Sequence, residues 1–356
     1  MKLDLPFLKK NDLIGLDIGS NSIKFVQLSK GKQGWQLVKL GIGYLPPEAI
    51  VDGSIIDSLT VADTIKNLVK EQDIKLNEVA SALTGHSIII KKVSLPVMTE
   101  DELAESIQWE AEQYIPFPIS DVNLDFQILG VDTEGGGQMD VMLVAVKKDV
   151  INDYINVIKD AGLEPVVMDV DSFALENLLE ANYNFEPNEN VAIVNVGASI
   201  TGLSILVGGV TVFTRAVPMG GNQFAEEIQK EISISFKDAE AVKLGQEVEG
   251  VDPNTVTPII ERLSGKLAIE IKRSIDFFLG GSAGVYINKI FLSGGASRAK
   301  ALSSTIESGT TLPVEVIEPF KNIICNEKTF DLNYLKEMSP YFAVAMGLAM
   351  RRVADR

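Results

Sequence analysis

The stretch GLDIGSNSIK, residues 15–24, decides the fold. Leu13 to Ile18 has the composition of a buried strand, a Gly-Ser-Asn turn follows, and Ile23 to Leu28 is a second strand. The first strand delivers Asp17 to its end. Gly19 permits a turn that a Cβ would obstruct, so the backbone amides of residues 19–22 point at one place. A turn of this kind is a cradle for an anion.

The residues after Gly19 suit a phosphate group. Those expected to contact it are Ser20, Asn21, Ser22 and Lys24. Lys24 lies on the returning strand and reaches a phosphate as a point charge. Asp17 could hold Mg²⁺ through water, because Mg²⁺ prefers few carboxylates and keeps its hydration. A simple Gly-Ser hairpin turn is the structural alternative.

The same layout returns in the second half of the chain. Strands are expected at Val191 to Val196, Thr201 to Val207 and Val210 to Val217, as a second meander. Its first turn is Asn195-Val-Gly197-Ala198-Ser199, and Gly220 and Gly221 follow the meander before a helix. An N-x-G turn is common by itself. Two such loops facing each other across a cleft would clamp both ends of a polyphosphate, and the repeat predicts two related α/β lobes.

A third loop, FLSGGASR at 291–298, joins a predicted strand to a predicted helix. The candidate binding residues in it are Gly294, Gly295, Ala296 and Arg298. A glycine pair here lets a flat ring approach the backbone, and a helix N-terminus favours polar or anionic ligand groups. A tight strand–helix connection is the alternative.

A long predicted helix carries Glu270, Lys272 and Arg273. Glu270 could bind a ribose, and the stem of Arg273 could stack on a base. A solvated charged face explains the same three residues without a ligand.

Composition excludes several classes of function. The chain has 356 residues, 32 basic against 49 acidic, a net charge of −17 and a pI near 4.6. Nucleic acids and anionic lipids attract Lys and Arg, so we expect neither as a partner. Cys325 is the only cysteine and His86 the only histidine, which excludes an intrachain disulfide and multi-histidine metal sites. The N-terminal MKLDLPFLKK lacks the pattern of a signal peptide, and no apolar run is long enough to span a bilayer.

Residues from about 85 to 149 break the lobe pattern. A strand from Ile88 to Leu95, a helix from Glu100 to Tyr114 and strands at Val122 to Gly130 and Met139 to Val146 predict a β-α-β-β insert. The turn DTEGGGQ at 132–138 joins its last two strands.

Taken together, these motifs resemble the actin/heat-shock-70/sugar-kinase superfamily, and more narrowly the PilM family, FtsA-like proteins of type IV pilus assembly. The resemblance covers nearly the whole chain. It is carried by IGLDIGSNSIK, IIIKKVSLPVM, WEAEQYIPFPISDVNLDFQIL, MLVAVKKDVI, AGLEPVVMDVDSFAL, VFTRAVPMGGNQF and EIKRSIDFF.

The resemblance implies an actin-like two-lobe α/β fold of duplicated ribonuclease H-like domains, with an FtsA-type 1C insert. The implied boundaries are 1–84, 150–185 and 335–356 for subdomain 1A; 85–149 for 1C; 186–225 and 265–334 for 2A; and 226–264 for 2B.

It also implies a function. A PilM-like protein binds ATP or ADP with Mg²⁺, grips the cytoplasmic N-terminal peptide of PilN, and links other platform proteins of the inner membrane to the motor. Such a protein is cytoplasmic and peripheral to the membrane through its partner. We expect the peptide between 1C and 1A, with contacts from Ile88 to Leu95 and the YIPFP corner at 114–118.

One position departs from the superfamily pattern. Active ATPases usually have Asp where this chain has Asn195, and an amide cannot serve as a base. Asp171, at a helix entry, could still orient a water. Binding with weak or absent hydrolysis is therefore expected. Alternatives are an FtsA-like filament, which would entail self-association, and a small-molecule kinase; the C-terminal MRRVADR lacks the amphipathic tail of FtsA.

Overall fold

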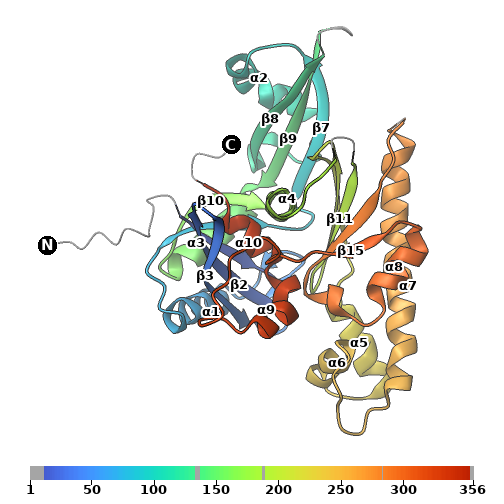
Figure 1. The fold of residues 1–356 in the computed structure, drawn as a ribbon. Helices are drawn as coiled ribbons and strands as arrows, with labels where there is room; N and C mark the ends of the chain where they lie inside the picture. Colours follow the sequence, from blue (N-terminus) through green and yellow to red (C-terminus); the bar gives the residue numbers. More distant parts are fainter. Residues whose placement is uncertain (1–11, 133–136, 187–188, 283, 353–356) are drawn as a thin grey trace, which may run out of the picture.

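Two five-stranded mixed sheets organise the molecule in the computed structural model (Figure 1). The structure describes residues 12–132, 137–186, 189–282 and 284–352. The N-terminal stretch MKLDLPFLKK and most of the DTEGGGQ turn lie outside the described residues. None of the described helices is both long and apolar enough to cross a membrane.

The first sheet has the order β10-β6-β1-β2-β3. Its strands are β1 (Ile14–Ile18), β2 (Ser22–Gly31), β3 (Gly34–Tyr44), β6 (Glu78–Leu83) and β10 (Glu164–Val170). The meander β1–β2–β3 is antiparallel, whereas β6 and β10 add in parallel through crossovers. Sequence analysis did not identify β6.

The second sheet repeats this plan in the order β13-β12-β11-β14-β15. Its strands are β11 (Val191–Val196), β12 (Thr201–Val207), β13 (Val210–Val217), β14 (Lys289–Ser293) and β15 (Val314–Val316). The antiparallel meander and the two parallel strands match the first sheet, so the predicted duplication is confirmed.

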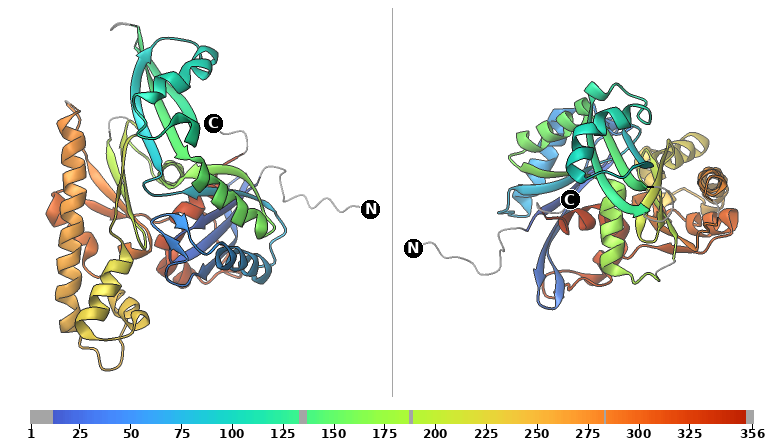
Figure 2. Two further views of the ribbon diagram at one scale, coloured as in Figure 1. Left: turned by 180° about the vertical axis from the view of Figure 1, so that it is seen from behind. Right: turned by 90° about the horizontal axis from the view of Figure 1, so that it is seen from above.

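Helices fill three layers around the sheets (Figure 2). The outer face of the first sheet packs on α1 (Ser58–Glu71) and α3 (Lys148–Asp160). Between the sheets lie α4 (Asp171–Asn182) and α10 (Ala343–Ala349), whose apolar residues join both sheets in one core. Over the outer face of the second sheet lie α5 (Gly221–Ile232), α7 (Pro253–Gly280) and α8 (Leu302–Thr310), with α6 (Phe236–Lys243) beside α5.

The middle layer depends on one glycine. A Cβ on Gly347 of α10 would lie 1.7 Å from the carbonyl oxygen of Ala174 on α4. Only the absence of a side chain lets these two helices touch by their backbones. The C-terminal region divides into α9 (Leu332–Met338), the 3₁₀ turn η3 (Ser339–Phe342) and α10.

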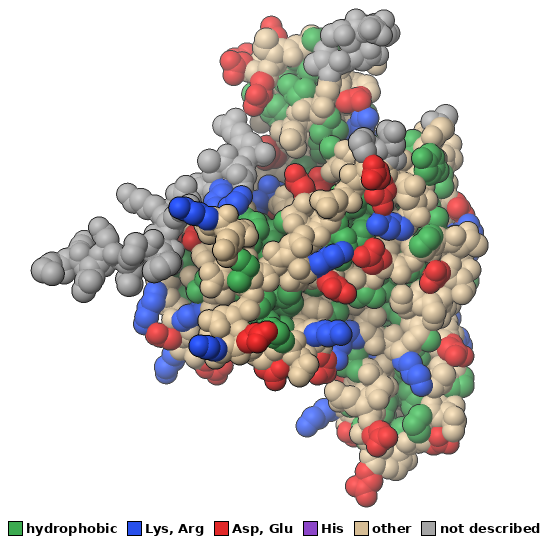
Figure 3. All heavy atoms as spheres, viewed as in Figure 1, with side chains coloured by type: hydrophobic (Ala, Val, Ile, Leu, Met, Phe, Trp, Pro, Cys, Tyr) green, Lys and Arg blue, Asp and Glu red, His purple; other side chains and the backbone are tan. Residues whose placement is uncertain are grey.

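The insert is a separate small layer above the first lobe. Strands β7 (Ile88–Pro96), β9 (Gln138–Lys147) and β8 (Val122–Asp132) form an antiparallel sheet in the order β7-β9-β8. Helix α2 (Glu100–Glu112) starts with a capping box between Thr99 and Glu102 and covers this sheet. In Figure 3, acidic side chains gather over this part of the molecule. The β-α-β-β prediction is confirmed.

Candidate functional site

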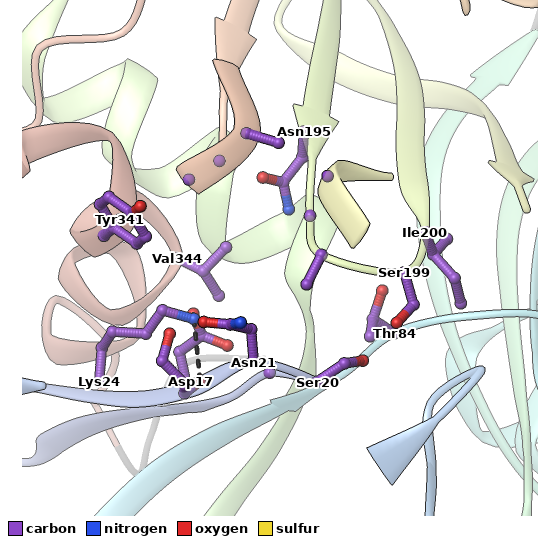
Figure 4. Close-up of a pocket in the computed structure, with 18 of the residues that line it drawn as sticks. Asp17, Ser20, Asn21, Lys24, Thr84, Asn195, Ser199, Ile200, Tyr341 and Val344 are labelled. Carbon is purple, nitrogen blue, oxygen red and sulfur yellow. Dashed lines mark hydrogen bonds and ion pairs between the residues drawn. The ribbon is translucent and has the colours of Figure 1, made fainter. Parts of the chain in front are cut away.

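The candidate site is the cavity between the lobes, where the β1–β2 turn faces the β11–β12 turn (Figure 4). Most of the predicted residues line it: Asp17, Gly19, Ser20, Asn21, Ser22, Lys24, Asp171, Asn195, Gly197, Ala198, Ser199, Gly221, Gly294, Gly295 and Ala296. Three loops that are distant in sequence therefore meet at one place. Gly220, Glu270, Arg273 and Arg298 do not line the cavity.

The β1–β2 turn is closed by its own backbone. The Gly19 amide donates to the Ser22 carbonyl oxygen at 3.1 Å. The Lys24 ammonium lies 2.9 Å from Oδ2 of Asp17 and donates to the Ser22 carbonyl oxygen at 3.2 Å. A Cβ on Gly19 would lie 3.0 Å from that ammonium. The absence of a side chain at Gly19 therefore leaves room for the ammonium at the cavity wall.

The β11–β12 turn has the same closure. The Gly197 amide donates to the Ile200 carbonyl oxygen at 3.0 Å. The start of α5 is joined to this turn, because the Gly221 amide donates to the Gly197 carbonyl oxygen at 2.9 Å. Gly220 lies behind the loop: a Cβ there would be 2.5 Å from the Ala198 carbonyl oxygen. Its role is to let the backbones pack.

The third loop approaches the second at its glycine pair. Gly294 has φ +90°, and a Cβ there would lie 2.3 Å from the Val196 carbonyl oxygen. Gly295 lies against the ring of Tyr341: a Cβ on Gly295 would come within 2.5 Å of a ring carbon. The predicted helix after this loop is α8, which starts at Leu302, and the 3₁₀ turn η2 (Gly295–Arg298) separates it from Gly294.

Arg298 stands behind this loop. Its guanidinium bonds Glu337 at 2.9 Å and lies 5.7 Å from the centre of the Tyr341 ring. Arg298 therefore positions the Tyr341 ring. This ring, Pro340 and Val344 form one wall of the cavity.

Asp171 closes the inner end of the cavity at the start of α4. Thr84 Oγ1 donates to its Oδ2 at 3.0 Å. Burial raises the pKa of the Asp171 carboxyl to about 6; the charge of Asp17 adds to the rise, and hydrogen bonds from Thr84, the Ser172 amide and Asn195 oppose it. The carboxyl is thus an acceptor at neutral pH that takes up a proton in mild acid.

Two charged residues of the site were missed by sequence reasoning. Glu240 and Lys243 of α6 line the cavity. Lys243 is 3% exposed, pairs with Glu240 and donates to the Gly221 carbonyl oxygen at 3.1 Å, and burial lowers its pKa. Their i, i+3 spacing after the Ser235 cap was a readable signal. Glu270 and Arg273 instead bond each other at 2.6 Å on α7.

The residues fit a magnesium–nucleotide better than a protein-bound metal. Among residues 12–132, 137–186, 189–282 and 284–352, no group of three His, Cys, Asp or Glu could hold an ion. Asp17 is a single carboxylate beside an anion cradle, which suits a hydrated Mg²⁺ that takes its other ligands from phosphates.

Solved structures share this architecture. Ethanolamine utilization protein EutJ from Carboxydothermus hydrogenoformans has 14% identity and a TM-score of 0.59, covering 97% of this chain and 91% of that one. MreB 5 of Spiroplasma citri bound to AMPPNP has 16% identity and a TM-score of 0.52, with 96% and 95% covered. The fold and the interlobe cavity thus define an actin-like α/β protein, which confirms the predicted fold class.

Matches of higher sequence identity show which family of actin-like proteins the chain belongs to. A chain of the solved PilM-PilN type IV pilus biogenesis complex is 30% identical over 97% of this chain and 99% of that one, with a TM-score of 0.85. The family model for type IV pilus assembly protein PilM matches residues 15–353. The chain belongs to this family. It is also 24% identical over 268 residues to cell division protein FtsA of Bacillus subtilis, a match that spans 66% of this chain and only 58% of FtsA.

Proposed function

We propose that the chain is a nucleotide-gated adaptor of type IV pilus assembly that binds ATP or ADP with Mg²⁺ between its lobes. The observation that carries the proposal is the pair of facing turns, β1–β2 and β11–β12, with Lys24 between them. Backbone amides and one cation are what a polyphosphate requires. The AMPPNP bound to MreB 5, which shares this fold, supports the same ligand class here.

In this proposal each wall of the cavity has a role. Ser20 to Ser22 and Gly197 to Ser199 would receive the phosphates, and Asp17 would hold the hydrated Mg²⁺. Glu240 is placed to accept from ribose hydroxyls, and the Tyr341 ring beside Gly295 offers a flat face to a base. Nucleotide occupancy would then draw the lobes together, because each lobe supplies one phosphate loop.

Hydrolysis is expected to be weak or absent. Asn195 occupies the position where an ionised Asp would complete a metal-and-water site, and its side-chain amide cannot take a proton. Asp171 is a second carboxylate at the inner end of the cavity that could orient a water. A turnover rate near that of ordinary enzymes, about 10 per second, would contradict this part of the proposal.

The partner we propose is the cytoplasmic N-terminal peptide of PilN, held between the insert and the first lobe. A hollow at this junction is lined by Phe117, Pro118, Ser120, Asp121, Lys147, Lys148 and Asp149. The Lys147 ammonium lies 4.5 Å from the centre of the Phe117 ring, and Lys148 donates to the Ser120 carbonyl oxygen at 2.7 Å. Strand β7 is one of the two edge strands of the insert sheet and could pair with an extended peptide.

These assignments use the subdomain boundaries that the resemblance implies, with 1C at 85–149. Attachment to the membrane platform and the motor would come through PilN and other pilus proteins, at the cytoplasmic face. A filament-forming role like that of FtsA is the second candidate, favoured by the 24% identity to that protein. Nucleotide-dependent sedimentation of the chain alone would distinguish the filament from the adaptor.

Calorimetric titration tests the adaptor directly. ATP–Mg²⁺ is titrated with and without a peptide of the PilN N-terminus. Binding of both, with a nucleotide affinity that changes when the peptide is present, is the expected outcome. Nucleotide binding without peptide binding would favour the filament or a kinase, and absence of nucleotide binding would make the turn at residues 17–24 purely structural.

A further inference from the structure

The outer face of helix α2 is exposed to solvent. Figure 1 shows α2 on the outside of the insert, away from the two lobes. The helix packs on the insert sheet through its buried residues Leu103, Ile107 and Ala111. Its opposite side presents Trp109, whose exposed fraction of 79% is the largest among the large hydrophobic side chains that the structure describes as exposed.

Trp109 lies between two carboxylates on this face. Glu105 precedes it by four residues and Glu112 follows it by three, and both are exposed. Residues at these spacings are neighbours on a helix surface, so the three side chains form one stripe of carboxylate, indole and carboxylate. A planar cation that stacks on the indole would have a carboxylate on either side of it.

Elsewhere the chain covers several partly exposed rings with its own cations. The distances from cation to ring centre are 5.0 Å for Lys91 over Tyr114, 4.5 Å for Lys147 over Phe117, and 5.1 Å and 4.7 Å for Lys30 and Arg352 over Trp35. Among the described residues no cation lies over Trp109. Because tryptophan attracts cations more strongly than the other aromatic rings do, its open face points to a cation from another molecule.

The acidic residues of α2 are only partly explained by the stability of the helix. Glu100, Asp101 and Glu102 lie in its first turn, where negative charge is favourable, and Glu102 also takes part in the capping box. Glu110 and Glu112 lie in the last turn, where negative charge opposes the helix dipole and no basic residue is present. A cation bound near this end would therefore be attracted by the carboxylates and by the helix terminus together.

The lysines of the insert do not serve this face. Residues 85–149 contain twelve acidic and four basic residues, so almost half of the net charge of −17 lies in less than a fifth of the chain. Lys92 pairs with Asp140 at 2.8 Å, and Lys148 donates to the Ser120 carbonyl oxygen. The other two lysines lie over the rings named above. The cation for α2 is therefore not one of the insert's own.

We propose that the outer face of α2 is a docking surface for a basic, arginine-bearing segment of a partner protein. A guanidinium is planar, so it stacks on Trp109 and donates in the same pose to Glu105 or Glu112, which an ammonium cannot do equally well. A metal ion is not the occupant, because no group of three acidic residues in the described part of the chain could hold one. The surface shares no residue with the nucleotide cavity or with the hollow proposed for the PilN peptide.

Fluorescence anisotropy of a labelled peptide of alternating arginine and glycine, titrated with the full chain, tests the proposal. We expect binding, with the matching lysine peptide about threefold weaker. Trp109→Ala should weaken binding of the arginine peptide about fivefold, whereas Trp109→Phe retains a ring and should keep most of it. The double variant Glu105→Gln, Glu112→Gln should weaken it about tenfold. Unchanged thermal unfolding of these surface variants verifies that each loss is local.

The matched control is the double variant Glu247→Gln, Glu249→Gln, which removes the same charge from exposed positions between α6 and α7. Its binding should stay within about twofold of wild type, because charges far from the site are screened by salt. An excess of the PilN N-terminal peptide should not displace the arginine peptide.

Four results would overturn the proposal. They are no binding of the arginine peptide, unchanged binding by Trp109→Ala, equal losses in the two double variants, or displacement by the PilN peptide. Equal losses would indicate general attraction to an acidic protein, and displacement would place the arginine peptide in the hollow at Phe117. None of these measurements involves nucleotide, so their failure leaves the proposed nucleotide site untouched.

Discussion

The ammonium of Lys24 and the carboxylate of Asp17 form an ion pair of 2.9 Å at the mouth of the interlobe cavity, with side chains 11% and 18% exposed. Their strands pair in register, Asp17 opposite Lys24, so the contact is a cross-strand pair of the sheet itself. A phosphate that arrives at Lys24 would compete with Asp17 for the ammonium, and Asp17 would become available to a hydrated cation.

Lys24→Met should therefore lower the affinity for ATP–Mg²⁺ by at least tenfold, because a charge-assisted contact contributes about 1.5–3 kcal/mol. Calorimetry measures the change. Lys66→Met, at an exposed position of α1, is the matched control and should bind as the wild type does. Equal affinities in the two variants would remove Lys24 from the phosphate site.

Glu240 and Glu270 offer a direct comparison between the structure and the sequence prediction. Glu240 lines the cavity, whereas Glu270 bonds Arg273 on α7. We expect Glu240→Gln to weaken nucleotide binding about tenfold, because a neutral amide oxygen replaces the charged acceptor for ribose hydroxyls, and Glu270→Gln to have no effect. Titration with ADP checks both, and the reverse order of effects would restore the sequence-based assignment.

Stability should depend on pH through Asp171. Its pKa is raised from 3.8 to about 6 in the folded state, so the folded protein holds this proton at pH values where the unfolded chain has lost it. The contribution of this carboxyl group to the free energy of unfolding is therefore fully present below about pH 4, and it is lost as the pH rises through about 6. Asp171→Asn should leave stability little changed near pH 4 and increase it by roughly 1–3 kcal/mol at pH 7.

Urea unfolding of Asp171→Asn at several pH values measures this effect. The exposed variant Asp63→Asn serves as the control and should show no such divergence from wild type between pH 4 and pH 7. A gain in stability for Asp171→Asn that is the same at every pH would show that burial of the charge is not its cause.

Two glycine-to-alanine variants should move stability in opposite directions. Gly347→Ala would place a methyl group 1.7 Å from the Ala174 carbonyl oxygen, so the middle helix layer must separate. We expect a loss of roughly 3 kcal/mol or more, or a failure to fold. Gly265→Ala, in α7 with nothing within 4 Å, should stabilise the chain by roughly 0.5–1 kcal/mol. Thermal unfolding compares the two.

Local patterns predicted much of this structure. The two meanders and the insert were readable because turn chemistry and strand alternation are local, and the two phosphate-type turns follow from the same signals. Contacts in the site between residues that are distant in sequence could not be predicted in this way. Tyr341 reaches the cavity only because η3 packs beside Gly295, and no spacing in the sequence shows that contact.

The misassignment of Glu270 has a similar cause. Both α6 and α7 carry charged residues at helical spacing, and only the packing of α5 and α6 beside the cleft decides which of them faces it. The 3₁₀ turn at residues 295–298 was missed because a Gly-Gly pair after a strand also suits the start of an α-helix. Strand β6 has weak alternation, since five of its six residues are buried.

The backbone of Gly15 in β1 touches α10: a Cβ there would lie 2.0 Å from the carbonyl oxygen of Ala345. During synthesis β1 leaves the ribosome long before α10 does. The first meander must therefore wait with its inner face uncovered while the insert and the second lobe are being made. An arrest of translation before residue 343 would reveal this interval as a sheet that is formed but still open to protease, and a chaperone that covers the face would protect it.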